Sequence, residues 1–71
     1  MENRIMTLRL RREQRRMTQA ELGVKLGVSQ SVVSEWEREL YCPNARQLPE
    51  IAAALGCEIG ELFVNAEEVS T

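Results

Sequence analysis

The chain has few of the residues that metal sites, disulfide frameworks and catalytic centres usually need. It contains no histidine and only two cysteines, Cys42 and Cys57, which lack metal-ligand spacing. We therefore expect two ordinary reduced thiols, with neither a zinc site nor a disulfide. The sequence also lacks a glycine-rich phosphate loop, a convincing carboxylate pair and an activated nucleophile. These absences predict a protein without catalysis and without a cofactor.

Long hydrophobic runs are missing as well. No apolar run approaches the roughly 20 residues that cross a bilayer, and no apolar stretch follows the charged N-terminal residues. We therefore expect a cytoplasmic protein without a membrane partner. The 71 residues suffice for one small domain, and below about 80 residues a core seldom supplies more than a few kcal/mol. Helix caps and a partner subunit should therefore matter for stability.

The charge is unevenly distributed along the chain. Residues 1–38 hold eight basic and five acidic side chains, a net charge of +3, whereas residues 39–71 hold one basic and six acidic side chains, a net charge of −5. Phosphate contacts need local rather than total positive charge. The split therefore favours a nucleic-acid-facing N-terminal half and an acidic, partner-facing C-terminal half, although a solvated arginine-rich helix would give the same pattern.

The segment 18–38 has the pattern of two short helices joined by a tight turn. Leu22 and Leu26 share one helical face, Gly27 follows where a helix must stop, and Val33 and Trp36 share the face of a second helix. Gly23 is costly inside a helix, by about 1 kcal/mol relative to alanine. Its presence predicts a close approach of two backbones and therefore a helix-turn-helix.

The stretch MTQAELGVKLGVSQSVVSEWERE resembles the pattern LTQxELAxxLGVSxxxISxWERG of the phage-repressor and Cro-like helix-turn-helix family, also called the xenobiotic-response-element family. The following PNARQLPEIAAALGCEIGELF is similar to that family's fourth and fifth helices, so the resemblance extends from Arg4 to Phe63. It implies an all-α fold, a compact five-helix lambda-repressor-like DNA-binding domain over residues 1–64, whose third helix lies in the DNA major groove. Residues 65–71 would form a short acidic tail.

Periodicity and caps predict where these helices lie. Thr18 and Glu21 form a capping box for a helix over Gln19–Leu26, and Ser29 caps a helix that ends near Arg38. The remaining predictions are a first helix over Asn3–Arg16, a fourth helix from an Asn44 cap to Leu55 that opens with a tight turn at Arg46–Leu48 before Pro49, and a fifth helix over Ile59–Phe63.

An arginine lies in the apolar stripe of the first predicted helix. Ile5, Leu8 and Arg12 share one face, and a buried guanidinium needs a carboxylate partner. Glu37 lies on the same side of the third helix as Val33 and Trp36. We therefore expect an Arg12–Glu37 ion pair, which many family members have at these positions.

The exposed face of the third helix supplies the candidate readers of DNA. Gln30 can bind adenine in bidentate fashion, Val32 can pack on a thymine methyl group, and Glu35 can accept from cytosine or repel wrong sequences. The candidate base contacts are Gln30, Ser31, Val32, Ser34 and Glu35, and the candidate phosphate contacts are Arg9, Arg12, Thr18, Gln19, Arg38 and Arg46. In the family, the glutamine equivalent to Gln19 binds phosphate and braces the first glutamine of the third helix. Simple solvation of an exposed helix is the alternative for each polar side chain.

The chain departs from the family pattern at several positions. Arg16 and Glu39 stand where the family often has glycine, so those turns would be strained or rearranged. The loop after the third helix has Leu40, Tyr41 and Cys42 where many relatives carry basic residues, which predicts fewer contacts with the DNA backbone and a lower affinity. Two apolar groups could form interfaces, namely the pair Met6 and Leu10 and the group Leu40, Tyr41, Leu62, Phe63 and Val64. In the second group we assign Leu62 and Phe63 to the core, and we expect Leu40, Tyr41 or Val64 to contact a partner.

These observations favour a transcriptional regulator, a repressor by preference, that binds double-stranded DNA as a homodimer on a palindromic operator. Two alternatives remain. An antitoxin of the same fold would bind DNA and also a toxin through the acidic half, and a protein-interaction module would have lost DNA affinity.

Overall fold

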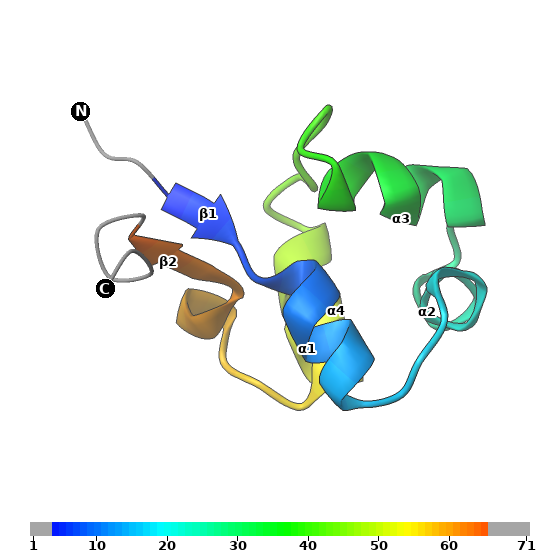
Figure 1. The fold of residues 1–71 in the computed structure, drawn as a ribbon, viewed down its shortest axis with the longest axis horizontal. Helices are drawn as coiled ribbons and strands as arrows, with labels where there is room; N and C mark the ends of the chain where they lie inside the picture. Colours follow the sequence, from blue (N-terminus) through cyan, green and yellow to red (C-terminus); the bar gives the residue numbers. More distant parts are fainter. Residues whose placement is uncertain (1–3, 66–71) are drawn as a thin grey trace.

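The computed structural model describes residues 4–65 of the chain, which form a helical domain closed by a small sheet (Figure 1). None of the described helices is long and apolar enough to cross a membrane. The elements in order are β1 (Arg4–Met6), α1 (Leu8–Gln14), α2 (Gln19–Leu26), α3 (Gln30–Glu37), α4 (Gln47–Leu55), the 3-10 helix η1 (Ile59–Leu62) and β2 (Phe63–Asn65). The sequence predicted the four α-helices, but not the sheet.

Helices α2 and α3 begin with the predicted caps. The Thr18 hydroxyl accepts from the backbone N–H of Glu21 at 3.0 Å, and the Glu21 carboxylate accepts from the Thr18 N–H at 2.8 Å. This capping box satisfies N–H groups that have no partner within the helix. Gly27 ends α2 with a φ of 71°, and the Ser29 hydroxyl accepts from the Val32 N–H at 3.3 Å. The boundaries predicted for these two helices are confirmed.

Gly23 lies where α2 meets the turn before α3. A Cβ at this position would lie 2.7 Å from the Val28 carbonyl oxygen, which is closer than real Cβ atoms approach. The Val28 N–H donates to the Gly23 carbonyl at 2.9 Å, so the turn folds back onto the helix. The close backbone approach predicted from this glycine is confirmed.

One apolar core holds the elements together. Helix α2 packs against α3 and α4, α1 contacts α3, and η1 packs on α4. The core consists of eight buried residues from these five helical elements, namely Leu8, Leu22, Val33, Trp36, Ile51, Ala52, Leu55 and Leu62. Phe63 is half-buried and packs against this core, together with Met6 and Val28. The assignment of Leu62 and Phe63 to the core is confirmed.

The first helix is shorter than predicted because the chain enters it through a strand. Residues Arg4–Met6 pair antiparallel with Phe63–Asn65, with Met6 opposite Phe63 (Figure 1). Thr7 then donates two hydrogen bonds of 2.7 Å each. Its backbone N–H donates to the Leu62 carbonyl, and its hydroxyl donates to the Glu61 carbonyl. These long-range bonds replace a helical first turn, so the predicted start at Asn3 is wrong. At the other end, Arg16 adopts a φ of 53° and the helix stops at Gln14.

The fourth and fifth predicted helices also need correction at their ends. Asn44 and Gln47 exchange two hydrogen bonds, Gln47 N–H to Asn44 Oδ1 at 3.1 Å and Asn44 N–H to Gln47 Oε1 at 2.9 Å, around a tight turn. The α-helical span starts only after this turn, with Arg46 at the N-cap position. Pro49 is the third residue of α4, where no intrahelical N–H bond is lost. The predicted fifth helix is the 3-10 helix η1, and its last predicted residue, Phe63, begins β2.

Candidate nucleic-acid interface

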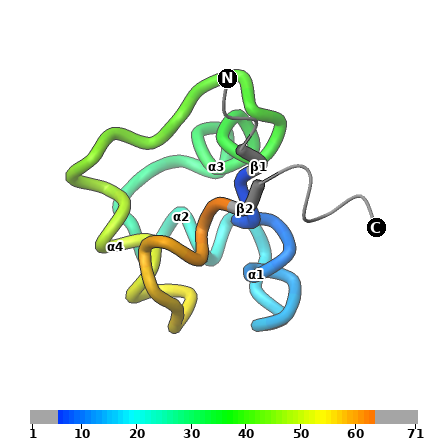
Figure 2. Tube along the Cα trace, turned by 90° about the vertical axis from the view of Figure 1, so that its left-hand side faces the viewer, coloured from blue at the N-terminus to red at the C-terminus, as the bar shows by residue number. Residues whose placement is uncertain are grey.

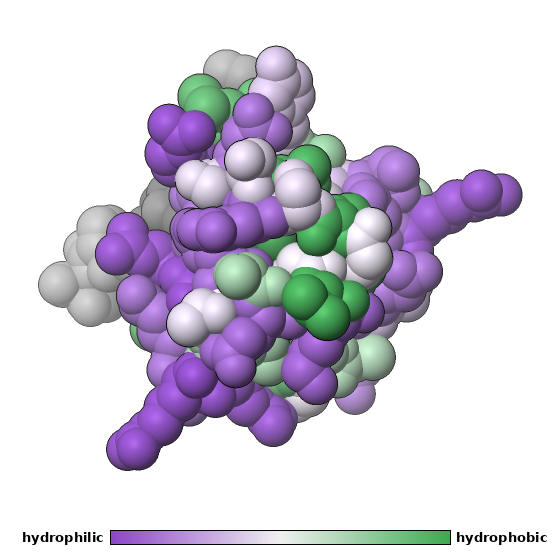
Figure 3. Space-filling model, turned by 90° about the vertical axis from the view of Figure 1, so that its right-hand side faces the viewer, coloured by the Kyte–Doolittle hydropathy of each residue, from purple (hydrophilic) through white to green (hydrophobic). Residues whose placement is uncertain are grey.

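The start of α2 and the outer face of α3 form a shallow polar hollow. Helix α3 turns Val33 and Trp36 into the core, so the residues between them face outward. Figure 3 views the molecule from the side on which α2 and α3 lie, and shows a mostly hydrophilic face with a small hydrophobic group. The residues lining the hollow are Gln19, Gln30, Ser31, Ser34, Glu35 and Arg38.

The structure brings four of the five candidate base-contacting residues to this hollow. Gln30 and Ser31 are exposed at the first turn of α3, and Ser34 and Glu35 are half-buried one turn further on. Val32 is half-buried and packs partly against the core, so only part of its side chain remains available. The four polar candidates therefore share one surface, and Val32 lies at its edge.

The candidate phosphate contacts are more scattered. Gln19 and Arg38 line the hollow, and Thr18 precedes Gln19 at the N-terminus of α2. Arg9 is exposed on α1, where its Nε donates to Glu13 at 3.3 Å, and Arg46 is exposed before α4. Neither Arg9 nor Arg46 belongs to the hollow. Contact with one DNA duplex by all these residues thus depends on how the protein docks.

Arg12 and Glu37 form the expected ion pair. Arg12 Nε lies 2.6 Å from Glu37 Oε2, Arg12 Nη2 donates to Glu37 Oε1 at 3.1 Å, and Arg12 Nη1 donates to the Met17 carbonyl at 2.6 Å. The side chains are only 10% and 3% exposed. The hydrogen bonds to Glu37 raise the pKa of the Arg12 guanidinium despite its burial. A guanidinium held this way joins α1 to α3, and little of it is accessible to a phosphate.

A chain of hydrogen bonds connects this ion pair to the surface. Gln19 Nε2 donates to Glu37 Oε1 at 3.0 Å, and Gln30 Nε2 donates to Gln19 Oε1 at 3.4 Å. The two glutamines thus lie side by side, as the family resemblance implied. The link from Glu37 to Gln19 was not predicted, because residues 18 positions apart in the sequence leave no periodic signal.

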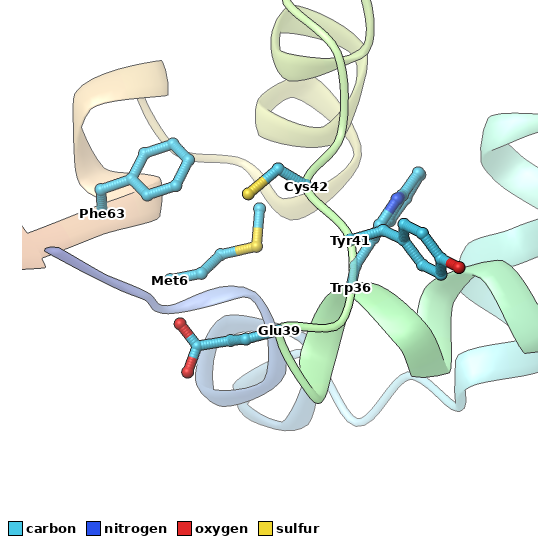
Figure 4. A pocket seen from close by; sticks show the side chains of 6 residues that line it. All are labelled: Met6, Trp36, Glu39, Tyr41, Cys42 and Phe63. Atoms are coloured by element: carbon cyan, nitrogen blue, oxygen red, sulfur yellow. The ribbon is translucent and has the colours of Figure 1, made fainter.

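A second hollow, mostly apolar, lies beside the sheet and the loop after α3. It has a volume of about 300 Å³ and is lined by Met6, Trp36, Glu39, Tyr41, Cys42 and Phe63. Figure 2 shows the connection between α3 and α4 as a wide loop along one side of the molecule. In Figure 4, Met6, Cys42 and Phe63 converge on the pocket, whereas the Tyr41 hydroxyl points away.

The sequence predicted that Met6 and Leu10 form an apolar pair. The structure shows that this prediction is wrong for Met6. It belongs to β1, packs against the core and lines the apolar pocket, because the chain before Thr7 is extended. Of these two residues, only Leu10 lies on α1, where it is 56% exposed. Leu40 and Tyr41, the residues expected to contact a partner, are 57% and 64% exposed. The side chain of Val64 and the expected tail beyond Asn65 lie outside the described residues.

Comparison with protein families identifies the class of this domain. The family model described as helix-turn-helix matches residues 8–62, from the start of α1 to the end of η1. The chain belongs to this helix-turn-helix family, and its similarity to phage repressors confirms the resemblance drawn from the motif at residues 17–39.

Two curated relatives are phage repressors. The chain is 40% identical over 50 residues to repressor protein C2 of Salmonella phage P22. The aligned region covers 70% of this chain and 23% of the relative. It is 33% identical over 51 residues to the immunity repressor protein of Bacillus phage phi105, covering 72% of this chain and 35% of that protein. The chain thus spans about a quarter to a third of the length of these relatives.

Solved structures share the fold. The P22 c2 repressor in complex with a synthetic operator superposes with a TM-score of 0.74 at 38% identity, covering 78% of this chain and 83% of that one. Hydroxypropylphosphonic acid epoxidase from S. wedmorenis superposes with a TM-score of 0.71 at 41% identity, but this chain covers only 30% of it. The same domain therefore occurs both in repressors and as one part of an enzyme.

Proposed function

We propose that this chain is a sequence-specific, double-stranded DNA-binding domain of a transcriptional repressor, acting in the cytoplasm without catalysis and without a cofactor. The observation that carries the proposal is the polar hollow, in which Gln30, Ser31, Ser34 and Glu35 share the exposed face of α3. A helix presented this way fits the major groove, where side chains near its N-terminus meet base edges. The similarity to a repressor solved with its operator supports the same docking.

Homodimerisation on a palindromic operator is part of the proposal. A single small helix-turn-helix buries little DNA surface, and the loop after α3 offers Leu40 and Tyr41 instead of basic side chains. These exposed apolar residues flank the apolar pocket and would pack against the same surface of a second copy. Two subunits would then present their α3 helices to half-sites about 34 Å apart.

Selection of bound duplexes from random DNA tests the proposal. We expect an enriched, two-fold symmetric site whose binding weakens steeply with salt, since phosphate contacts release counterions. Gln30→Ala should relax the preference at one position per half-site, by about 1 to 3 kcal/mol. The matched control is Gln14→Ala, which changes an exposed glutamine on α1 outside the hollow.

Three other outcomes would redirect the interpretation. No salt-dependent DNA binding at all would favour the protein-interaction module. DNA binding together with capture of a toxin encoded by a neighbouring gene would favour the antitoxin. If sedimentation shows one protomer binding an isolated half-site as tightly, per site, as two bind the palindrome, the homodimer is wrong.

A further inference from the structure

The side-chain amide of Gln19 lies between a carboxylate and a second amide. Its Nε2 donates to Glu37 Oε1 at 3.0 Å, and its Oε1 accepts from Gln30 Nε2 at 3.4 Å. Glu37 is fixed in turn, because its side chain is 3% exposed and its Oε2 lies 2.6 Å from Arg12 Nε. The anchor of this arrangement is therefore buried, while its far end, Gln30, is exposed beside the polar hollow.

The chemistry of Glu37 sets the direction of both amides. An ionised carboxylate only accepts hydrogen bonds, so Gln19 must turn its NH₂ group toward Glu37 and its carbonyl oxygen outward. A carbonyl oxygen in turn attracts only a donor, so Gln30 must turn its own NH₂ group toward Gln19. Each amide thus keeps one orientation instead of the two that a free glutamine can adopt.

This orientation determines what Gln30 can offer to a base. One N–H is used on Gln19, which leaves one N–H and the carbonyl oxygen. Adenine presents an acceptor at N7 and a donor at N6 in the major groove, whereas guanine presents two acceptors at N7 and O6. The remaining pair on Gln30 is complementary to adenine, and its carbonyl oxygen faces an acceptor on guanine. A reversed Gln30 would present both N–H groups and could bind guanine.

We propose that Glu37 is a positioning residue that, through Gln19, fixes Gln30 in the orientation that selects adenine over guanine. The proposal rests on the DNA-binding function proposed above, because Gln30 must face a base. It assigns to Glu37 a role in specificity that is separate from its ion pair with Arg12.

The test compares base preference rather than affinity. The base facing Gln30 is the position whose preference is lost in Gln30→Ala. At that position we expect the wild-type chain to prefer adenine to guanine by roughly tenfold or more. Gln19→Met keeps the length of the side chain but removes both hydrogen bonds, so the preference should fall to about threefold or less. Any phosphate contact of Gln19 affects both duplexes equally and cancels in the ratio. Gln14→Met is the matched control and should leave the ratio unchanged.

Glu37→Gln tests the anchor itself. The neutral amide can donate as well as accept, so Gln19 regains both orientations and the ratio should fall as it does in Gln19→Met. In the double variant Gln19→Met with Glu37→Gln, the ratio should fall no further than in either single variant, because both changes interrupt one chain of hydrogen bonds. If Glu37→Gln does not fold, the ¹⁵N side-chain resonances of the labelled wild-type chain test the same contact. The Gln19 NH₂ protons should then be shifted and protected relative to those of the exposed Gln14.

The outcomes separate the two proposals. A wild-type chain that enriches no DNA sequence would overturn the proposed function. A wild-type chain that enriches a site but reads no adenine through Gln30, or keeps its ratio in Gln19→Met, would overturn only the role of Glu37. Gln19 NH₂ resonances identical to those of Gln14 would do the same.

Discussion

The ion pair between Arg12 and Glu37 gives the sharpest prediction about stability. Glu37→Ala would leave a guanidinium that is 10% exposed without its carboxylate. Removing one partner of a buried pair costs about 3 to 5 kcal/mol, and we expect about 3 kcal/mol here because Arg12 keeps its bond to the Met17 carbonyl. For a domain of this size, such a loss lowers Tm by roughly 12 to 24 °C. Urea unfolding and calorimetry measure it directly.

A double-mutant cycle distinguishes a buried charge from lost packing. Adding Arg12→Met to Glu37→Ala removes the unpaired cation and refills the apolar stripe beside Leu8, so much of the lost stability should return. Recovery stays incomplete because the Met17 carbonyl loses its donor. If Glu37→Ala alone does not fold, folding of the double variant still supports the reasoning. Strictly additive losses would refute it, since independent sites show no coupling.

Three further predictions follow from the structure, two about the backbone and one about the capping box of α2. Arg16→Gly and Glu39→Gly should each stabilise the domain by up to about 1 kcal/mol in urea unfolding, because both positions have positive φ, 53° and 61°. Gly23→Ala should destabilise it by about 1 to 3 kcal/mol in the same assay, since the added Cβ meets a backbone carbonyl. The hydrogen bond from the Thr18 N–H lowers the pKa of Glu21 in the folded state. The ionised Glu21 side chain therefore stabilises the folded domain above the pKa that it has in the unfolded chain, and this stabilisation is lost as pH falls through the lowered folded-state pKa. In melting curves measured as a function of pH, Glu21→Gln should lose less stability on acidification than the wild-type chain does.

The predictable part of the fold is the part encoded by short-range chemistry. The capping box at Thr18 and the left-handed glycine at Gly27 act within a single helical turn, so the bounds of α2 and α3 follow from the sequence. The strand at Arg4–Met6 does not, because its partner lies about sixty residues away and its apolar residues also fit a helical period. Thr7 shows the same limit, since it bonds to η1 instead of capping α1.

The candidate site divides in the same way. The face of α3 follows from the burial of Val33 and Trp36, so the polar residues of its outer face could be predicted from spacing alone. Arg12 and Glu37 could also be paired, because a buried charge demands a partner. The bond between Glu37 and Gln19 depends on how α2 crosses α3, and spacing does not specify that crossing. Arg16 and Glu39 both adopt positive φ although neither is a glycine, so the strained turns expected at these two positions are present.

In the role proposed for it, Glu37 contributes both to the stability of the domain and to base reading. Glu37 accepts from Arg12 through both oxygens, and from Gln19 through one of them. A loss of DNA binding in a Glu37 variant is therefore ambiguous on its own. The double variant Arg12→Met with Glu37→Ala separates the two roles, because it should recover stability without restoring the link to Gln19. We expect this variant to fold and still discriminate adenine from guanine poorly at the position facing Gln30. A stable double variant with wild-type discrimination would show that Glu37 serves the fold alone.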